Sequence, residues 1–74
     1  MNALYEGLAE ILEIDVAQVN PALRLEEHAW DSLAIVSTIA LVDDSFNVLL
    51  DGQSLGKCET VADIEQLIEA GKKG

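Results

Sequence analysis

The chain has 74 residues, a length that fits one small domain covering residues 1–74. Its 14 acidic and 4 basic residues give a formal net charge of −10, which excludes nucleic acid as a partner because phosphate binding needs clustered lysine or arginine. Hydrophobic residues make up 50% of the chain, which excludes disorder, while the longest apolar stretch is too short to span a membrane. The single cysteine, Cys58, permits no internal disulfide and suits a reducing compartment, so we expect a monomeric cytoplasmic protein.

The first predicted element is an amphipathic helix near the start of the chain. Its apolar residues recur at helical spacing: Leu4, Leu8, Ile11 and Leu12. A long segment from Asp15 to Asp31 follows, in which this periodicity fades and Pro21 breaks any continuing helix. Because the segment also contains apolar residues, we expect it to pack against the helices rather than to form a free linker.

The second predicted helix runs from Ser32 to about Phe46, a stretch that contains no glycine or proline. The residues expected to face inward form one helical line: Ile35, Ile39, Val42 and Phe46. Three more are expected to widen this stripe: Leu33, Val36 and Ala40. The residues expected to face outward form the opposite line: Ala34, Ser37, Leu41 and Asp44. A helix that is apolar around most of its circumference is either central or touched by a partner.

Residues 47–58 are predicted to form a loop with at most one short helical turn, because glycines interrupt them. The last helix is expected to begin at Thr60, which stands in capping-box spacing with Asp63, and to stop at Gly71. The chain is therefore predicted to be all-α, a small up-and-down helical bundle with three main helices and one short helix.

The most informative short pattern is an acid followed by a serine at the start of the second helix, Asp31-Ser32. Such residues usually cap a helix by accepting a hydrogen bond from a backbone N–H group. The first N–H groups of a helix lack intrahelical partners, so an anion attached to Ser32 would meet these donors and the positive end of the helix dipole. The chain has one histidine, His28, no nucleophile elbow and no metal-ligand spacing, so we expect neither a catalytic residue nor a metal site.

Three patterns occur together in this chain: Asp31-Ser32-Leu33, an aliphatic helix closing on Phe46, and the run Thr60-Val61-Ala62-Asp63-Ile64. By their order and spacing, the chain resembles an acyl carrier protein over residues 4–68. The resemblance implies that Ser32, flanked by Asp31 and Leu33, carries 4'-phosphopantetheine through a phosphodiester bond. The thiol of this arm would carry acyl groups as thioesters between enzymes. A separate phosphopantetheinyl transferase would supply the base and the metal for attachment.

The sequence departs from carriers of general fatty acid synthesis, which typically have a Gly-x-Asp-Ser-Leu run and several acids along the serine helix. Here Ala29-Trp30 precedes Asp31, and Ala34 and Ser37 occupy positions where acids are common. These departures favour a specialised carrier, and the cargo stays open between fatty acyl, polyketide and aminoacyl groups. A peptidyl or aminoacyl carrier is one alternative. An unmodified acidic helical module that only binds other proteins is the other.

Partner enzymes that load or accept the acyl group are expected to dock beside Ser32, on the outward line of the second helix. The expected contact residues are Ala34, Ser37 and Leu41, with Asp43 and Asp44 as a charged rim. Such a face suits partners with basic or apolar docking surfaces.

Overall fold

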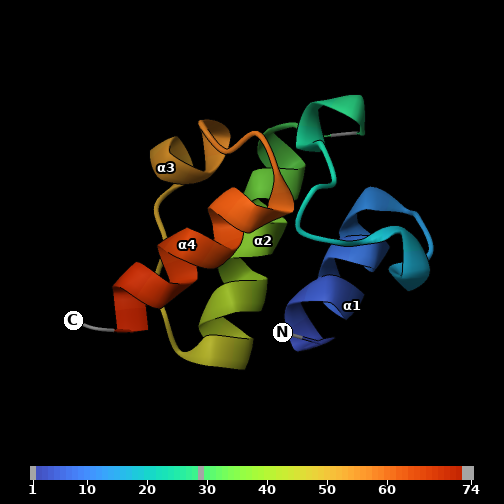
Figure 1. Ribbon diagram of the computed structural model, residues 1–74. Helices are drawn as coiled ribbons and strands as arrows, with labels where there is room; N and C mark the ends of the chain where they lie inside the picture. Colours follow the sequence, from blue (N-terminus) through green and yellow to red (C-terminus); the bar gives the residue numbers. More distant parts are fainter. Residues whose placement is uncertain (1, 29, 73–74) are drawn as a thin grey trace.

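The computed structural model describes residues 2–28 and 30–72 and is built from helices (Figure 1). The α-helices are α1 (Asn2–Leu12), α2 (Ser32–Phe46), α3 (Gly52–Gly56) and α4 (Val61–Lys72). Two short 3-10 helices, η1 (Val16–Gln18) and η2 (Leu25–Glu27), lie in the connection between α1 and α2. The predicted all-α class, with three main helices and one short helix, is confirmed.

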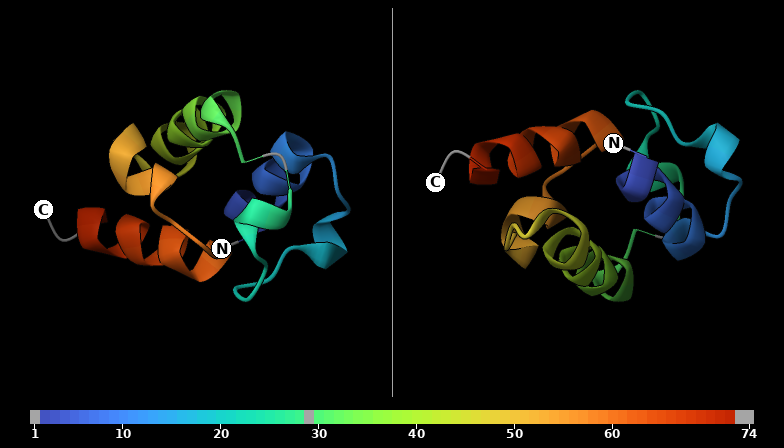
Figure 2. Two further views of the ribbon diagram at one scale, coloured as in Figure 1. Left: turned by 90° about the horizontal axis from the view of Figure 1, so that it is seen from above. Right: turned by 90° about the horizontal axis from the view of Figure 1, so that it is seen from below.

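The helices α1, α2 and α4 surround a common centre, and α3 lies beside α2 (Figure 1, Figure 2). In the view of Figure 1, α1 runs upward, whereas α2 and α4 both run downward. The directions do not alternate strictly, because residues 47–60 carry the chain back along α2 before α4 begins. The start of α2 therefore lies at the same end of the bundle as α3.

The long connection between α1 and α2 is held against the start of α4 by backbone hydrogen bonds. The N–H group of Val61 donates to the carbonyl oxygen of Leu23 at 3.2 Å. The N–H group of Ala62 donates to the carbonyl oxygen of Pro21 at 3.0 Å. These two bonds satisfy donors at the helix start that have no intrahelical acceptor. Leu25, from the same connection, is fully buried, so the expectation that this segment packs against the helices is confirmed.

The helix α2 begins and ends where the sequence predicted, but its most buried face is different. The buried residues lie four apart: Ala34, Thr38 and Val42. The Thr38 hydroxyl donates to the carbonyl oxygen of Ala34 at 2.8 Å, so its polar atom is satisfied inside the bundle. The prediction that Ala34 faces outward is therefore wrong. Val42 is buried as predicted, and Ile35, Ile39 and Phe46 are partly buried against the core.

The exposed face of α2 is formed by Leu33, Val36, Ala40 and Asp43. Leu33 is 75% exposed, Val36 is 61% exposed and Ala40 is exposed as well, so the expectation that these three residues widen the inward stripe is wrong. The exposed line lies one residue before the predicted one, which corresponds to a rotation of about 100° around the helix axis. The physical reason is that α2 is apolar nearly all the way round, so its periodicity does not single out the face that α1 and α4 cover.

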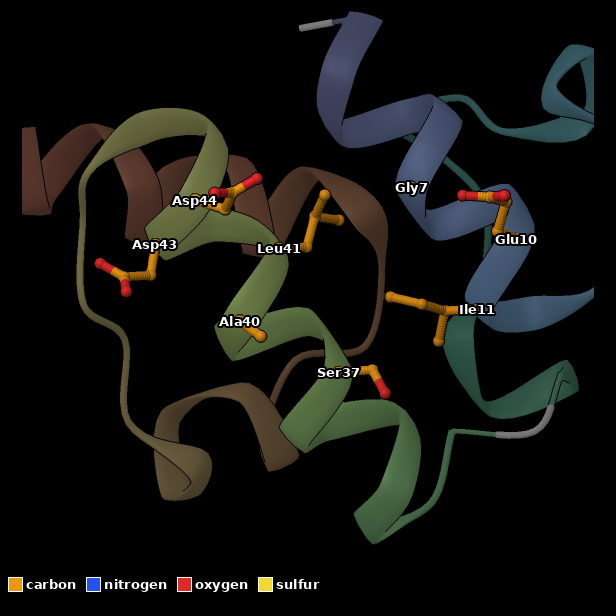
Figure 3. Close-up of a pocket in the computed structure, with 8 residues that line it drawn as sticks. All are labelled: Gly7, Glu10, Ile11, Ser37, Ala40, Leu41, Asp43 and Asp44. Carbon is orange, nitrogen blue, oxygen red and sulfur yellow. The ribbon is translucent and has the colours of Figure 1, made fainter.

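The predicted outward line instead lies largely toward α1 (Figure 3). Leu41 is half-buried, and a Cβ atom on Gly7 of α1 would lie 2.5 Å from both of its Cδ atoms. Ser37 is also half-buried and points toward Ile11 of α1, whereas Asp44 stays exposed. Gly7 costs about 1 kcal/mol relative to alanine within a helix. The close approach of Leu41 explains why a residue without a side chain stands there.

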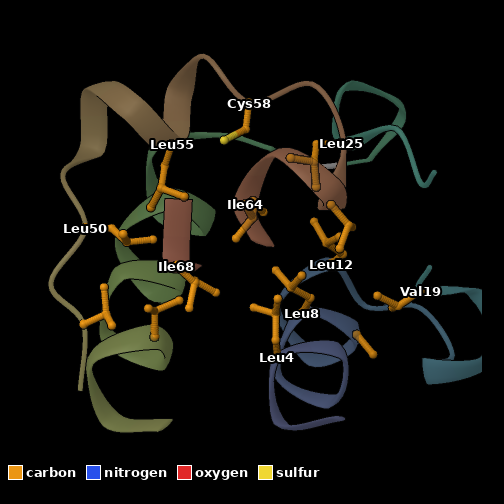
Figure 4. Close-up of a cluster of buried hydrophobic side chains, with 14 residues drawn as sticks. Leu4, Leu8, Leu12, Val19, Leu25, Leu50, Leu55, Cys58, Ile64 and Ile68 are labelled. Carbon is orange, nitrogen blue, oxygen red and sulfur yellow. The ribbon is translucent and has the colours of Figure 1, made fainter. Parts of the chain in front are cut away.

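The core lies between α1, α2 and α4 and is closed by α3 (Figure 4). Its fully buried large side chains come from all these helices and from η2: Leu4, Leu8, Leu25, Val42, Leu55, Val61, Ile64 and Ile68. The phenol of Tyr5 adds a polar link between α1 and α4 by donating to the carboxylate of Glu65 at 2.7 Å. The same carboxylate raises the pKa of Tyr5, because the hydrogen bond is lost when the phenol ionises.

Both helices after α2 begin with a capping carboxylate. The Asp51 side chain accepts from the N–H group of Ser54 at 3.1 Å and starts α3, the short helix predicted within residues 47–58. The Asp63 carboxylate accepts from the backbone N–H groups of Glu59 at 2.9 Å and Thr60 at 3.2 Å, so the predicted role of Asp63 at the helix start is confirmed. These bonds lower the pKa of both aspartates, since they favour the ionised form.

The prediction that Gly71 stops the last helix is wrong, because α4 continues through it to Lys72. Gly71 lies so close to Val48 that a Cβ atom would overlap its Cγ1 methyl group. The glycine is therefore required by packing rather than by a left-handed turn. In the next residue, the Lys72 ammonium lies 5.4 Å from the centre of the Phe46 ring, within cation–π range. None of the helices in the described part of the chain is long and apolar enough to cross a bilayer.

Candidate functional site

Ser32 is the first residue of α2, and its side chain is exposed. The preceding residue, Asp31, has extended backbone angles and caps the helix, with its Oδ1 atom accepting from the N–H group of Ala34 at 2.9 Å. The intrahelical ladder begins when the N–H group of Ile35 donates to the Asp31 carbonyl oxygen at 2.9 Å. The N–H groups of Ser32 and Leu33 precede that ladder, so they are donors available beside the hydroxyl. The capping role therefore belongs to Asp31 and leaves the serine hydroxyl at the surface.

The loop that leads into Ser32 is tied to α3 by the residue two positions earlier. The indole Nε1 atom of Trp30 donates to the carbonyl oxygen of Leu55 at 3.2 Å, and its ring is half-buried. The backbone N–H group of Trp30 donates to the carbonyl oxygen of His28 at 2.7 Å. Ala29, part of the motif in the sequence, lies outside the described residues. These contacts fix the direction in which the chain enters α2.

Only some of the residues predicted to surround Ser32 lie at the protein surface beside it. Leu33 is the exposed neighbour of Ser32, as a partner contact requires, but Ala34 is buried beneath it. Sequence reasoning missed Val36, which lies on the same exposed face as Leu33 one turn further along. The sequence contains one indication of this orientation. Ala34 and Thr38 are small and lie four residues apart, and small residues allow close packing against another helix.

A groove separates α1 from α2 and is lined by the predicted residues Ser37, Leu41, Asp43 and Asp44 (Figure 3). It has a volume of about 590 Å³. A smaller depression of about 160 Å³ adjoins it beside the start of α2 and is lined by Asp31 and Leu33 among others. Both hollows share Ile11 and Ser37 in their walls. Four of the five predicted partner residues therefore line a groove against α1, and the fifth, Ala34, is buried.

Two reactive side chains lie away from Ser32. Cys58 is buried, with its thiol within 3.4 Å of the carbonyl oxygen of Ser54. Burial, helped by the negative charge of Asp63, raises the pKa of the Cys58 thiol to about 11, so it is a small buried hydrophobe rather than a nucleophile. His28 is half-buried in the loop at the end of η2. Within residues 2–28 and 30–72, no three histidine, cysteine or acidic side chains are grouped to hold a metal ion.

A small helical bundle that exposes a serine at the start of its second long helix, behind a capping aspartate, has the architecture of a carrier domain. The family model described as "Phosphopantetheine attachment site" matches residues 2–68. The chain therefore belongs to the acyl carrier protein family, whose members carry covalently attached 4'-phosphopantetheine.

Relatives include both short carriers and a segment of a much longer protein. The chain is 32% identical over 75 residues to an acyl carrier protein of Helicobacter pylori, covering 95% of this chain and 96% of that one. It is 32% identical to the acyl carrier protein MbtL of a Mycobacterium species, covering 92% of this chain and 78% of that protein. It is also 35% identical to part of an orsellinic acid synthase of Beauveria bassiana, covering 88% of this chain but only 3% of the synthase.

Proposed function

We propose that Ser32 is the attachment site of 4'-phosphopantetheine and that residues 1–74 act as one acyl carrier domain. The observation that carries this proposal is the exposed hydroxyl at the first position of α2, directly after the capping Asp31 and before the exposed Leu33. The other serines of α2 are less well placed, since Ser37 is half-buried against α1 and Ser45 lies at the far end of the helix. The domain then provides position, and a separate transferase provides the base and metal.

The residues around Ser32 fit a phosphodiester. Asp31 occupies the N–H group of Ala34 and keeps the helix start ordered, while the N–H groups of Ser32 and Leu33 would face the phosphate. The positive end of the α2 dipole favours the negative charge there. When attached, the arm supplies a thiol that forms thioesters with acyl groups. The high pKa of Cys58 keeps the thiol of the chain itself from competing for acyl groups.

Intact mass after incubation with coenzyme A and a promiscuous phosphopantetheinyl transferase tests the attachment site. The wild-type chain is expected to gain the mass of one phosphopantetheine, and Ser32→Ala is expected to gain none. Ser45→Ala is the matched control, because it removes a hydroxyl from the same helix, and it should be modified like the wild type. Circular dichroism should show that both variants are folded. Modification of Ser32→Ala, or no modification of the folded wild type, would contradict the proposal.

We further propose that the transferase and acyl-handling enzymes dock on the exposed line of α2, Leu33, Val36, Ala40 and Asp43. Two large apolar side chains stand exposed there beside the serine, and the net charge of −10 favours partners with basic surfaces. Ala34 and Leu41, which the sequence placed on the docking face, do not belong to this surface, because Ala34 is buried and Leu41 packs against Gly7 of α1. Asp44 is exposed near the end of α2, so it can still form part of the charged rim of this docking surface.

Binding kinetics with the same transferase test this surface. Val36→Glu is expected to raise the dissociation rate, because it removes an apolar contact and introduces a charge. Asp43→Lys is expected mainly to slow association and to make it less dependent on salt, because steering acts at long range. Glu69→Lys, an exposed charge reversal on α4, is the control for a general charge effect. Equal dissociation rates for Val36→Glu and the wild type would exclude this face as the docking surface.

The specialised role expected from the sequence also belongs to this proposal. The loop before Asp31 is anchored to α3 by the ring of Trp30, and Ser37 lines a groove rather than adding a charge to α2. Both features support a carrier with dedicated partner enzymes. The single buried thiol, Cys58, supports a reducing compartment such as the cytoplasm.

A further inference from the structure

The groove between α1 and α2 starts beside the proposed attachment site. The smaller hollow, at the start of α2, is lined by Asp31 and Leu33, the two neighbours of Ser32. It shares Ile11 and Ser37 with the larger hollow further along α2. Together the residues that line the two hollows extend along α2 from Leu33, near the start of the helix, to Asp44, near its end. Because the groove starts beside Ser32, a group attached to this residue could lie in it.

The floor and the rim of the groove differ in chemistry. The floor is apolar and comes from both helices, with Ile11 and Gly7 from α1 and Ala40 and Leu41 from α2. Because Gly7 has no side chain, the methyl groups of Leu41 pack against the backbone of α1 and form part of this floor. The rim contains the hydroxyl of Ser37 and carboxylates, of which those of Glu10 and Asp44 point toward the space between the helices (Figure 3). No lysine or arginine is among the residues that line either hollow.

A pantetheine chain matches these surfaces. Between its phosphate and its thiol it is uncharged, with two amide N–H groups and a hydroxyl that can donate to the rim and with methyl and methylene groups that can cover the floor. Its extended length from phosphorus to sulfur is roughly 15 Å, if three bonds advance about 3.5 Å as in an extended peptide. Ser32 and Leu41 are nine residues apart in α2, or about 14 Å at 1.5 Å per residue.

We propose, on the basis of the attachment at Ser32 proposed above, that the groove between α1 and α2 is the resting site of the pantetheine arm and that its acidic end favours a positively charged acyl group. With the arm laid along α2, the acyl group lies between Glu10 and Asp44. A cationic group, such as the ammonium of an aminoacyl thioester, is attracted there, and a carboxylate-bearing acyl group is repelled. The chemical class favoured is therefore aminoacyl cargo over dicarboxylic cargo.

Amide chemical shifts of nitrogen-15-labelled apo and holo protein test the resting site. If the arm occupies the groove, attachment should shift the amides of Ile11, Ser37 and Leu41 as well as those near Ser32. Ser37→Phe, at a residue that lines both hollows and lies outside the proposed docking surface, fills the groove and should abolish the distant shifts at Ile11 and Leu41 while the local shifts at Ser32 remain. Ser45→Phe, an exposed position of the same helix that does not line the groove, is the matched control and should leave both sets unchanged.

The outcomes separate this inference from the proposed function. Shifts confined to residues 31–34, or distant shifts around Leu55 on the α3 side, would overturn the groove while leaving the carrier function intact. Failure to attach any arm would instead contradict the proposed function. For the charge preference, glycyl and malonyl groups linked by a stable amide to the arm are compared. The glycyl group should give the larger shifts at Glu10 and Asp44, and the difference should vanish in Glu10→Gln/Asp44→Asn; equal shifts in the parent protein would overturn the preference.

Discussion

Trp30 and Leu55 are joined by a hydrogen bond of 3.2 Å from the indole Nε1 atom to the backbone carbonyl oxygen. This bond connects the loop that leads into Ser32 with α3, 25 residues further along the chain. The direction of the loop at the attachment site therefore depends on α3, a helix of only five residues that is held by its buried Leu55 side chain and its Asp51 cap.

Trp30→Phe should loosen this connection. The ring is largely retained, but the carbonyl oxygen of Leu55 loses the indole donor and keeps only the backbone N–H group of Cys58, so we expect the free energy of unfolding to fall by about 1 kcal/mol. Hydrogen exchange of the α3 amides should become faster. Tyr5→Phe is the matched control, since it removes one side-chain donor between α1 and α4 and should leave α3 exchange unchanged. Unchanged α3 exchange in Trp30→Phe would show that the bond does not hold the loop.

Gly71→Ala should destabilise the protein although alanine is the better helix former. The added Cβ atom overlaps Val48, a buried β-branched residue with little freedom to move. We expect a loss of about 1 kcal/mol in the free energy of unfolding, at the low end for overpacking because the last turn of α4 can fray.

Gly56→Ala is the control for the effect of removing a glycine. Its Cβ atom would lie 3.8 Å from the nearest methyl group of Ile35, an ordinary contact, so the substitution should be neutral or slightly stabilising. Urea denaturation of both variants measures the difference. Equal stability of the two alanine variants would argue against the packing role of Gly71.

The Cys58 thiol should be inert in the folded protein. With a pKa of about 11, only about one thiol in a thousand is ionised at pH 8. Iodoacetamide should therefore label folded apo protein hardly at all, label the holo protein once on its arm, and label unfolded holo protein twice. Rapid labelling of Cys58 in folded apo protein would contradict its burial.

The same thiol predicts a loss of stability at alkaline pH. Its pKa is raised above the ordinary value of 9.0, so the folded state keeps the proton that the unfolded state loses. The stabilisation is complete below about pH 9 and declines as the pH rises toward 11. Cys58→Ala should show a smaller decline in the thermal midpoint over this window. If the thermal midpoints of Cys58→Ala and the wild type decline equally, ionisation of other groups, such as Tyr5, causes the loss of stability.

Salt should raise the thermal midpoint. A net charge of −10 on 74 residues opposes compaction, and among the described residues the one ion pair, Arg24–Glu26, is exposed. The midpoint should rise between low and moderate salt, and divalent cations should act at lower concentration. The double variant Glu6→Gln/Glu69→Gln, which neutralises two exposed acids, should respond less steeply. A midpoint independent of salt would mean that the acids are locally compensated.

The helices were predictable because their boundaries depend on local chemistry. Asp31 and Asp63 are caps that can be recognised from neighbouring residues, and Phe46 ends an uninterrupted run. The orientation of α2 was not predictable, because Leu33 and Ala34 look equally suited to burial in the sequence. Only contacts with other helices decide between them, and these depend on residues far away in the chain.

The attachment site could be predicted as a motif but its surroundings could not. Asp31-Ser32-Leu33 is contiguous, so its geometry follows from the start of one helix. The groove depends on the distance between α1 and α2, which is set by a glycine 34 positions away from Leu41 in the chain. Gly71 was misassigned for a similar reason, since its contact with Val48 comes from another element.

The carbonyl oxygens of Pro21 and Leu23 accept from the N–H groups of Ala62 and Val61, and this arrangement has a consequence for how the protein is made. During translation the connection before Ser32 emerges well before its partners do. It cannot be anchored until residue 62 has left the ribosome, by which time most of the chain has been synthesised. We therefore expect nascent chains that end before α4 to present Ser32 on an unanchored loop, so that a transferase meets the finished site only on a completed domain.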